Sequence, residues 1–266
     1  MPIYTGTADA NGDFDISFGA NSYTSGEKIT ITAEKDAATK SIELYAPSEV
    51  VGGGNIRFTG SVDDFPNNIG GVEIHGIIGI INANAFSAVI ANSIWTKATS
   101  LKISDGVTSI GTQAFRAWGN ALSLQLPDSI TSMGANAFDG WNKATELTIP
   151  NSIETIPTYC FNAWYAIKSL VIPDNVRVVA NQAFNDWRAC LTVDIGAGVE
   201  NIGVQAMYNL AACNEIICRA TTPPAIQSNT FQNLKSTCVI KVPAGSIAAY
   251  QAAANWSAFA ARIQAI

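Results

Sequence analysis

The side chains that could perform chemistry are few in this chain, and they do not converge on a catalytic set. The sequence has one histidine, His75, which stands where later copies of a repeat carry proline. A metal centre or a Ser-His-Asp arrangement needs more convergent partners than one histidine provides. No GxGxxG, P-loop or HExxH motif occurs, and the adjacent carboxylates Asp63 and Asp64 lie in a polar stretch. We therefore expect no catalysis, and we interpret His75 as an exposed or capping side chain at a strand end.

Oxygen-bearing side chains alternate near the N-terminus, at Asp9, Asn11, Asp13 and Asp15. Such ligands suit Ca²⁺, but the glycine and the distal glutamate of an EF-hand loop are misplaced here. The favoured interpretation is a solvated hairpin tip, with a calcium site as the alternative. The sequence thus predicts neither a metal nor a cofactor.

The cysteines point to a structural role. They are five in number, so they cannot all pair, and they form no CxxC motif. Cys190 and Cys213 occupy the same column of successive repeats, which predicts that they stack as neighbours. Buried free thiols acting as small apolar side chains are favoured over disulfides, and this suits folding in a reducing compartment. The other three are Cys160, Cys218 and Cys238.

A repeat with a fixed period positions all of these residues. Successive copies begin at Leu101, Leu124, Leu147 and Leu170. An early copy begins at Val72, and two eroded copies follow after position 192. A fixed period of 20–29 residues with recurring apolar positions is typical of a leucine-rich-repeat solenoid. The fold class is therefore a solenoid of short parallel strands with short helices or turns, preceded by a small all-β module.

The chemistry of one copy explains its structure. The opening Leu-x-Leu or Leu-x-Ile places two apolar side chains on one face of a strand. A proline such as Pro127 closes the strand because it has no N–H to donate. An apolar residue such as Met133 then points back into the stack, and Ala-Phe opens a short helical turn with a tryptophan three residues later. No copy can bury its apolar side alone, so stacking neighbours must build the core.

The ends of the chain differ from the repeats and define three regions. Residues 1–51 form a small β module for attachment or oligomerisation, from strands at 4–8, 14–18, 28–33 and 40–45. Residues 52–71 are a Gly-rich linker and N-terminal cap, beginning with Gly52-Gly53-Gly54. Residues 72–266 are the solenoid, closed by a cap helix over Ser246–Trp256.

Composition excludes several classes of function. The formal net charge of −6 disfavours a nucleic-acid partner bound through its phosphates. No run of about 18 apolar residues is present, so we expect no membrane insertion. The N-terminal segment lacks the basic start and apolar stretch of a signal peptide, which favours a route other than secretion. Prior removal of a signal peptide is the alternative.

The repeats resemble the BspA-like class of leucine-rich repeats, whose pattern runs LxxLxLPxxLxxIxxxAFxxC. The terminal segment VPAGSIAAYQAAANWSAF is similar to the closing segment of such proteins, and the resemblance covers residues 72–266. In this chain tryptophan replaces the usual cysteine of the pattern. The resemblance implies binding by bacterial surface proteins to host or partner macromolecules, without catalytic residues. Separately, the segment 1–50 resembles modules at the start of phage and prophage tail proteins.

Two surfaces are candidates for binding. The tryptophan column is favoured as a structural stack, but limited interior space predicts partly exposed rings, and a repeated aromatic platform also suits ligands such as sugars. The concave strand face carries small, mixed side chains without a dominant charge. The candidate Trp edge comprises Trp118, Asn120, Trp141, Asn142, Trp164, Tyr165, Trp187 and Arg188. The candidate concave face comprises Lys102, Gln125, Glu146, Thr148 and Asp194.

These observations favour a phage or prophage tail-tip or fibre protein located in the virion. Residues 1–51 would contact other tail proteins, with a homo-oligomer as one option, and the solenoid would recognise a bacterial surface protein or glycan. The alternative is a leucine-rich-repeat adhesin on a bacterial cell surface. An enzyme is the third and least favoured class.

Overall fold

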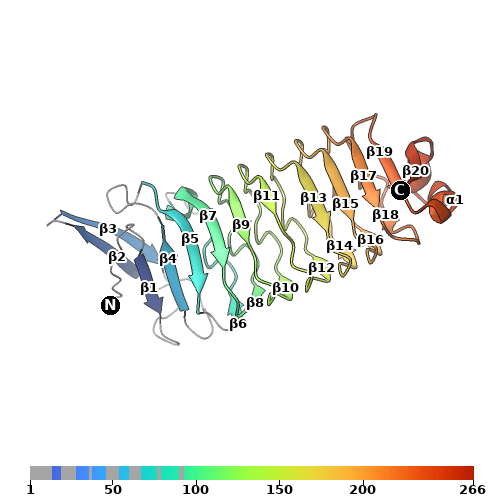
Figure 1. Cartoon of the computed structure of the whole chain (residues 1–266). Coiled ribbons are helices and arrows are strands. Elements are labelled where there is room, and N and C mark those ends of the chain that lie inside the picture. The colour runs from blue at the N-terminus through green and yellow to red at the C-terminus, as the bar shows by residue number, and fades with distance from the viewer. Residues whose placement is uncertain are drawn as a thin grey trace.

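Each copy of the repeat adds one strand to a main sheet and one shorter strand to a second sheet, so the copies stack along one axis (Figure 1). The computed structural model describes residues 14–18, 28–35, 38–45, 54–59, 67–76, 79–89 and 93–266. The strands that form the main-sheet side of the stack are β5 (Gly70–His75), β7 (Ala98–Ile103), β9 (Ser123–Gln125), β11 (Glu146–Leu147), β13 (Ser169–Ile172), β15 (Thr192–Ile195), β17 (Glu215–Cys218), β19 (Val239–Val242) and β20 (Ile263–Ala265).

The second sheet runs along the other side of the same stack. Its strands are β6 (Gly79–Ile81), β8 (Val107–Ile110), β10 (Ser132–Met133), β12 (Thr155–Ile156), β14 (Val178–Val179), β16 (Asn201–Ile202) and β18 (Ala225–Ile226). The 3-10 helix η1 (Ile94–Lys97) precedes β7.

The strand register confirms the predicted solenoid. Neighbouring strands are parallel, and Leu101 pairs with Leu124 just as Leu170 pairs with Val193. Each column of the repeat therefore stacks on itself. Strand pairing is interrupted between β11 and β13 in the main sheet and between β10 and β12 in the second sheet. The turns still connect the two copies by hydrogen bonds there, because the Phe138 N–H donates to the Cys160 carbonyl at 3.0 Å.

The core lies between the two sheets and is built from the predicted columns. Burial alternates along β13, where Leu170 and Ile172 are buried and the residues preceding each of them are exposed. The inward residues of the second sheet are buried, as predicted for Ile110, Met133, Ile156 and Val179. The small-residue column and the phenylalanine column are fully buried, including Ala137 and Phe138.

The segment around Ala-Phe forms tight turns rather than helices. Its N–H groups alternate between local partners and the adjacent repeat: Ala114 donates to the Gly111 carbonyl at 3.2 Å, and Phe115 to the Ala137 carbonyl at 2.9 Å. Because the inter-repeat bonds take every second N–H, a helix cannot propagate. Each turn also contains residues at positive φ, such as Gln113 at 58° and Ala117 at 68°.

The N-terminal strands β4 (Gly54–Phe58) and β1 (Phe14–Phe18) extend the main sheet through antiparallel pairing, so the chain direction reverses at each of these two strands. β4 pairs antiparallel with β5, and β1 pairs antiparallel with β4. β2 (Lys28–Lys35) and β3 (Ala38–Tyr45) form a separate antiparallel pair. Three of the four strands predicted in this region are therefore confirmed, and the fourth, at 4–8, lies outside the described residues. Gly54 opens β4, whereas Gly52 and Gly53 of the predicted linker lie outside the described residues.

The C-terminal cap is composed of several short elements. η2 (Ala244–Ser246) and α1 (Ile247–Ala252) are followed by η3 (Trp256–Arg262) and the edge strand β20. The helix predicted over Ser246–Trp256 is confirmed only over Ile247–Ala252, because Ala253 is extended, with ψ of 145°, and ends it. Asn255 then adopts a left-handed conformation with φ of 65° before η3. Trp256 is buried and its indole N–H donates to the Pro224 carbonyl at 2.7 Å, which secures the cap to the last repeat.

Candidate functional site

The tryptophan column lies inside the core, so the expectation of partly exposed rings is wrong. Trp118, Trp141, Trp164 and Trp187 are 0% exposed and Trp95 is 8% exposed. The rings stack nearly parallel, with centroids of Trp118 and Trp141 5.6 Å apart at 2°. Each ring also meets the phenylalanine of its own copy edge-on, as for Phe115 and Trp118 at 5.5 Å. The interior therefore holds both aromatic columns side by side.

Each of the four fully buried indole N–H groups has a hydrogen-bond partner in the preceding copy. Trp141 donates to the Phe115 carbonyl at 2.8 Å, and Trp164 donates to the Phe138 carbonyl at 2.8 Å. Trp118 and Trp187 repeat this contact at 2.7 and 2.6 Å. Buried polar groups without partners are costly, and here the carbonyl of one repeat satisfies the indole of the next. No face of these four indoles is available to a partner unless the stack opens.

The polar members of the candidate Trp edge do lie on the surface, in the turns before the main-sheet strands. Asn120 donates to the Thr96 carbonyl at 2.7 Å and accepts from Lys143 Nζ at 2.8 Å. Asn142 is exposed and Tyr165 is half-buried. The Arg188 guanidinium lies 4.1 Å from the centroid of the Tyr165 ring. A hydrogen bond from Arg188 to Asp186 raises the pKa of this arginine.

The outward side of the main sheet, which we call the main-sheet face, brings together the residues predicted as the concave face. Gln125, Glu146 and Thr148 are exposed in its centre. The charged members nearer its ends are paired across repeats. Lys102 Nζ lies 3.9 Å from Glu73, and Arg219 donates two hydrogen bonds to Asp194 at 2.6 and 2.7 Å. Among the described residues, Glu146 is the one acidic or basic side chain in this centre.

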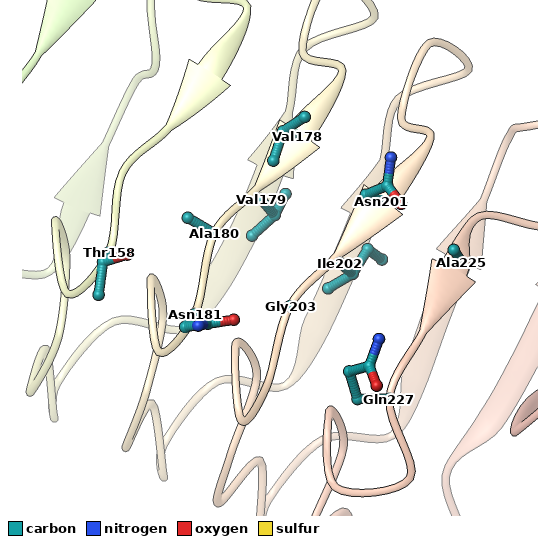
Figure 2. Close-up of a pocket in the computed structure, with 10 residues that line it drawn as sticks. All are labelled: Thr158, Val178, Val179, Ala180, Asn181, Asn201, Ile202, Gly203, Ala225 and Gln227. Atoms are coloured by element: carbon teal, nitrogen blue, oxygen red, sulfur yellow. The ribbon is translucent and has the colours of Figure 1, made fainter.

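Val171 is an apolar residue on the main-sheet face and is 60% exposed, although its column is polar or charged in most other copies. One feature of the surface was missed at the level of sequence. A shallow hollow of about 330 Å³ lies on the second sheet over β14, β16 and β18 (Figure 2). The amides of Asn201 and Gln227 border the hollow, while the Asn181 side-chain carbonyl oxygen is occupied by the Val204 N–H at 2.9 Å. No sequence motif marks this hollow, because its lining comes from several repeats.

The N-terminal edge of the main sheet holds a charged cluster. The Asp15 carboxylate lies 3.0 Å from His75 Nε2 and 3.3 Å from the Arg57 guanidinium. Burial alone would raise the pKa of Asp15, but the hydrogen bonds from His75 and Arg57 outweigh it and lower this pKa below its usual value. His75 stands at a strand end, as predicted, and its side chain is 33% exposed. The sequence contained no signal for this pairing, because the three residues come from three separate strands.

Metal ligation is not apparent in the described part of the chain. No group of three or more His, Cys, Asp and Glu side chains is placed there to hold a metal ion. Asp9, Asn11 and Asp13 lie outside the described residues, so the calcium alternative stays a prediction. Among the described residues, no helix is long and apolar enough to cross a membrane.

The cysteines are free and buried, as predicted. Burial raises the pKa of Cys190 to about 12, which makes its thiol a poor nucleophile. The Sγ atoms of Cys213 and Cys238 are 3.8 Å apart. The cysteine column of Cys190 and Cys213 therefore continues to Cys238 in the last copy.

Comparison with known proteins identifies the repeat. The family described as "BspA type Leucine rich repeat region" matches in 6 copies, over residues 80–214 and 163–255. No curated protein matches the chain.

Several solved structures are similar to this chain. A leucine-rich repeat protein from Bacteroides ovatus has a TM-score of 0.50 at 15% identity, over 91% of this chain and 54% of that one. A leucine-rich repeat protein of T. pallidum has a TM-score of 0.49 at 17% identity, over 65% and 77%. The pneumococcal vaccine antigen PcpA has a TM-score of 0.49 at 15% identity, over 71% and 55%. The chain thus spans little more than half the length of two of these three proteins.

Proposed function

The chain belongs to the BspA-type leucine-rich repeat family, and from this premise we propose that it is a non-catalytic binding protein. The main-sheet face would contact a bacterial surface protein or glycan. Family membership supports binding rather than catalysis, because the repeat is a scaffold that displays side chains. The described residues contain no convergent set of nucleophile, base and oxyanion donors that would argue for an enzyme.

One observation carries this proposal: the inward columns repeat while the outward positions vary. Trp, Phe and small residues recur in the core and are almost completely buried. On the main-sheet face, the same outward position is occupied by Gln125, Thr148 and Val171 in three consecutive copies. A rigid stack thus holds different exposed side chains at regular spacing, which suits specific recognition without a change of shape.

The setting of this binding is a second part of the proposal. The BspA-type family supports display on a bacterial cell surface. A virion tail-tip or fibre is the other setting, and it rests on the resemblance of the segment 1–50 to tail modules. In that setting residues 1–51 would attach the protein to other tail proteins. Localisation by immunogold labelling of bacterial envelopes and of induced phage particles separates the two settings.

The binding proposal is tested with substitutions that add bulk and charge to the main-sheet face. Thr148→Arg with Val171→Arg places two long cations in its centre, and both residues are exposed in the folded chain. The matched control is Thr131→Arg with Val204→Arg, since these residues are exposed away from this face. The measurement is binding of fluorescent protein to intact bacteria and to host epithelial cells by flow cytometry.

We expect the main-sheet variant to lose most of its binding, while the control retains it and both keep their melting temperatures. Equal binding by both variants would assign recognition to another surface. Absence of binding to any cell by the unaltered chain would refute the proposed function.

A further inference from the structure

One edge of the main sheet is basic, although the chain as a whole has a formal net charge of −6. This edge consists of the turns that enter β7, β9, β11, β13, β15 and β17, where the arrows of these strands begin in Figure 1. Three positions define the surface of each turn. In the turn before β7 they are Thr96, Lys97 and Thr99, and in each later turn they are the residues in the same three columns of the repeat. Across the six turns these positions hold no acidic residue, and their basic residues are Lys97, Lys143, Lys168 and Arg188. We call this edge the basic flank.

The cations of the basic flank are accessible. All four residues are exposed. The side-chain ammonium groups of Lys97 and Lys168 have no hydrogen bond or ion pair with any described residue, and the Lys143 ammonium donates only to the neutral amide of Asn120. Arg188 is paired with Asp186 at 2.5 Å, so it contributes less net charge. Three ammonium groups are therefore free to meet an anion.

The opposite edge of the main sheet has the reverse sign. The turns that leave the strands carry the exposed residues Asp105, Asp128 and Asp174. Two acidic side chains of the main-sheet face adjoin the basic flank: Glu146 at the start of β11, and Glu215 at the start of β17, which is paired with Lys241 Nζ at 2.6 Å. An approaching polyanion is thus attracted to one edge and repelled by the other.

The spacing of the flank suits a linear polyanion. Parallel strands lie roughly 4.8 Å apart, so cations in successive or alternate copies are within about 5–10 Å of one another along the axis. This distance is close to the Debye length of about 8 Å at physiological ionic strength, so their potentials reinforce one another.

Exposed apolar side chains lie among these cations. Leu122 is 51% exposed and Leu191 is 41% exposed, and both occupy the third position of their turns. The Tyr165 ring, beneath Arg188, adds an aromatic surface between them. Sugar rings have apolar faces that pack on such side chains, whereas a phosphate chain gains nothing from leucine.

From these observations we propose that the basic flank binds a linear acidic polysaccharide, with carboxylates on the lysines and sugar rings on Leu122, Tyr165 and Leu191. The inference rests on the proposed binding function and names a class of partner and a second contact surface for it.

The test measures binding of the full chain to polygalacturonate by biolayer interferometry at low and high salt. The flank variant is Lys97→Gln, Lys143→Gln and Lys168→Gln. The control variant is Lys28→Gln, Lys35→Gln and Lys40→Gln, which removes the same charge from β2 and β3, outside both sheets of the solenoid. We expect the flank variant to lose roughly tenfold or more in affinity and the control to stay within about twofold. Tyr165→Ala with Leu191→Ala, which leaves all charges in place, should lose several-fold. Added salt should weaken binding by the unaltered chain.

Several outcomes overturn the inference. These are no binding of polygalacturonate by the unaltered chain, an equal loss in the control, or equally tight binding of polyglutamate or duplex DNA. Retention of affinity by the Tyr165 and Leu191 variant would also overturn it, because charge alone would then explain binding. The flank variant is also tested in the cell-binding assay above. If the unaltered chain binds cells but not polygalacturonate, this inference fails while the proposed function stands.

Discussion

At the scale of single residues, the tryptophan column shows how one substitution in a repeat pattern changes the core. Cysteine fills this column in the resembling pattern, and tryptophan fills it here in five consecutive copies. The larger ring is accommodated because it stacks on its neighbours and because its N–H reaches a phenylalanine carbonyl in the preceding copy. The column thus contributes both apolar burial and a directional hydrogen bond between repeats.

Trp164→Phe tests the hydrogen bond within this column. The substitution keeps an aromatic ring but removes the donor to the Phe138 carbonyl, which leaves a buried acceptor unpaired. We expect the free energy of unfolding to fall by about 1–3 kcal/mol, measured by urea denaturation. As a control, Tyr159→Phe removes a hydroxyl that makes no hydrogen bond with a described residue, and it should change stability by less than about 0.5 kcal/mol. Equal effects of the two substitutions would contradict the assigned role of the indole N–H.

Asp15 provides a prediction about pH. Its pKa is lowered in the folded chain, so its stabilising contribution is present above its unfolded pKa of about 3.9 and is lost as pH falls through the folded value. Asp15→Asn should therefore lower the melting temperature at about pH 5, and the difference from the unaltered chain should vanish near pH 2. Asp128→Asn, at an exposed carboxylate without a described partner, should show no such pH-dependent difference. A constant difference for Asp15→Asn across this range would contradict the pairing with His75 and Arg57.

At the scale of elements, the turns show how stacking imposes an unfavourable backbone on ordinary residues. One column of the turns is in the left-handed region in every well-formed copy, with φ of 68° at Ala117, 83° at Gly140 and 63° at Ala163. Only one of these residues is glycine, which adopts this region at little cost. The inter-repeat hydrogen bonds of the turn must therefore offset the strain at the alanines, for example the bond from the Ala163 N–H to the Asn185 carbonyl at 2.9 Å.

Exchanging alanine and glycine in this column measures that strain. Gly140→Ala should destabilise the chain by about 1–2 kcal/mol, because its left-handed φ disfavours a Cβ and the new atom would lie 3.3 Å from Ala117 Cα. Ala163→Gly relieves the same strain but adds backbone entropy to the unfolded chain, so we expect a change between zero and a gain of about 1 kcal/mol. Both are measured by urea denaturation. Destabilisation by Ala163→Gly as large as that of Gly140→Ala would show that the turn geometry is not limiting.

At the scale of the whole molecule, the stack needs closed ends because an open end would expose core side chains and unpaired strand edges. At the C-terminal end, Tyr250 donates from its hydroxyl to the Ala220 carbonyl at 2.8 Å, and β20 covers the edge of β19. At the N-terminal end, β4 covers the edge of β5 and β1 covers the edge of β4, both by antiparallel pairing. We propose that the boundary of the N-terminal region lies near Gly52–Gly54.

Limited proteolysis tests this division of the chain. We expect early cleavage near Gly52–Gly54 and a resistant fragment that extends from about position 54 to the C-terminus, because β4 pairs with β5 and contributes Ile56 and Phe58 to the core. The fragment is identified by mass spectrometry. The resistance has a physical reason, since residues 93–266 form consecutive hydrogen-bonded copies in which local opening must break contacts to both neighbours. Early cleavage scattered between positions 100 and 230 would contradict a continuously stacked solenoid.

The sequence by itself determined the repeat, the parallel stacking and the inward columns. Each copy must bury the same chemical face, so the recurrence of Leu101, Leu124, Leu147 and Leu170 is sufficient to place equal residues above one another. Only the tertiary structure decided which of these residues a partner can reach. The depth of Trp141, the pairing of Asp194 with Arg219 and the replacement of helices by turns all depend on contacts between neighbouring copies. Such contacts depend on the distance and orientation between strands, which a pattern of residue types does not contain.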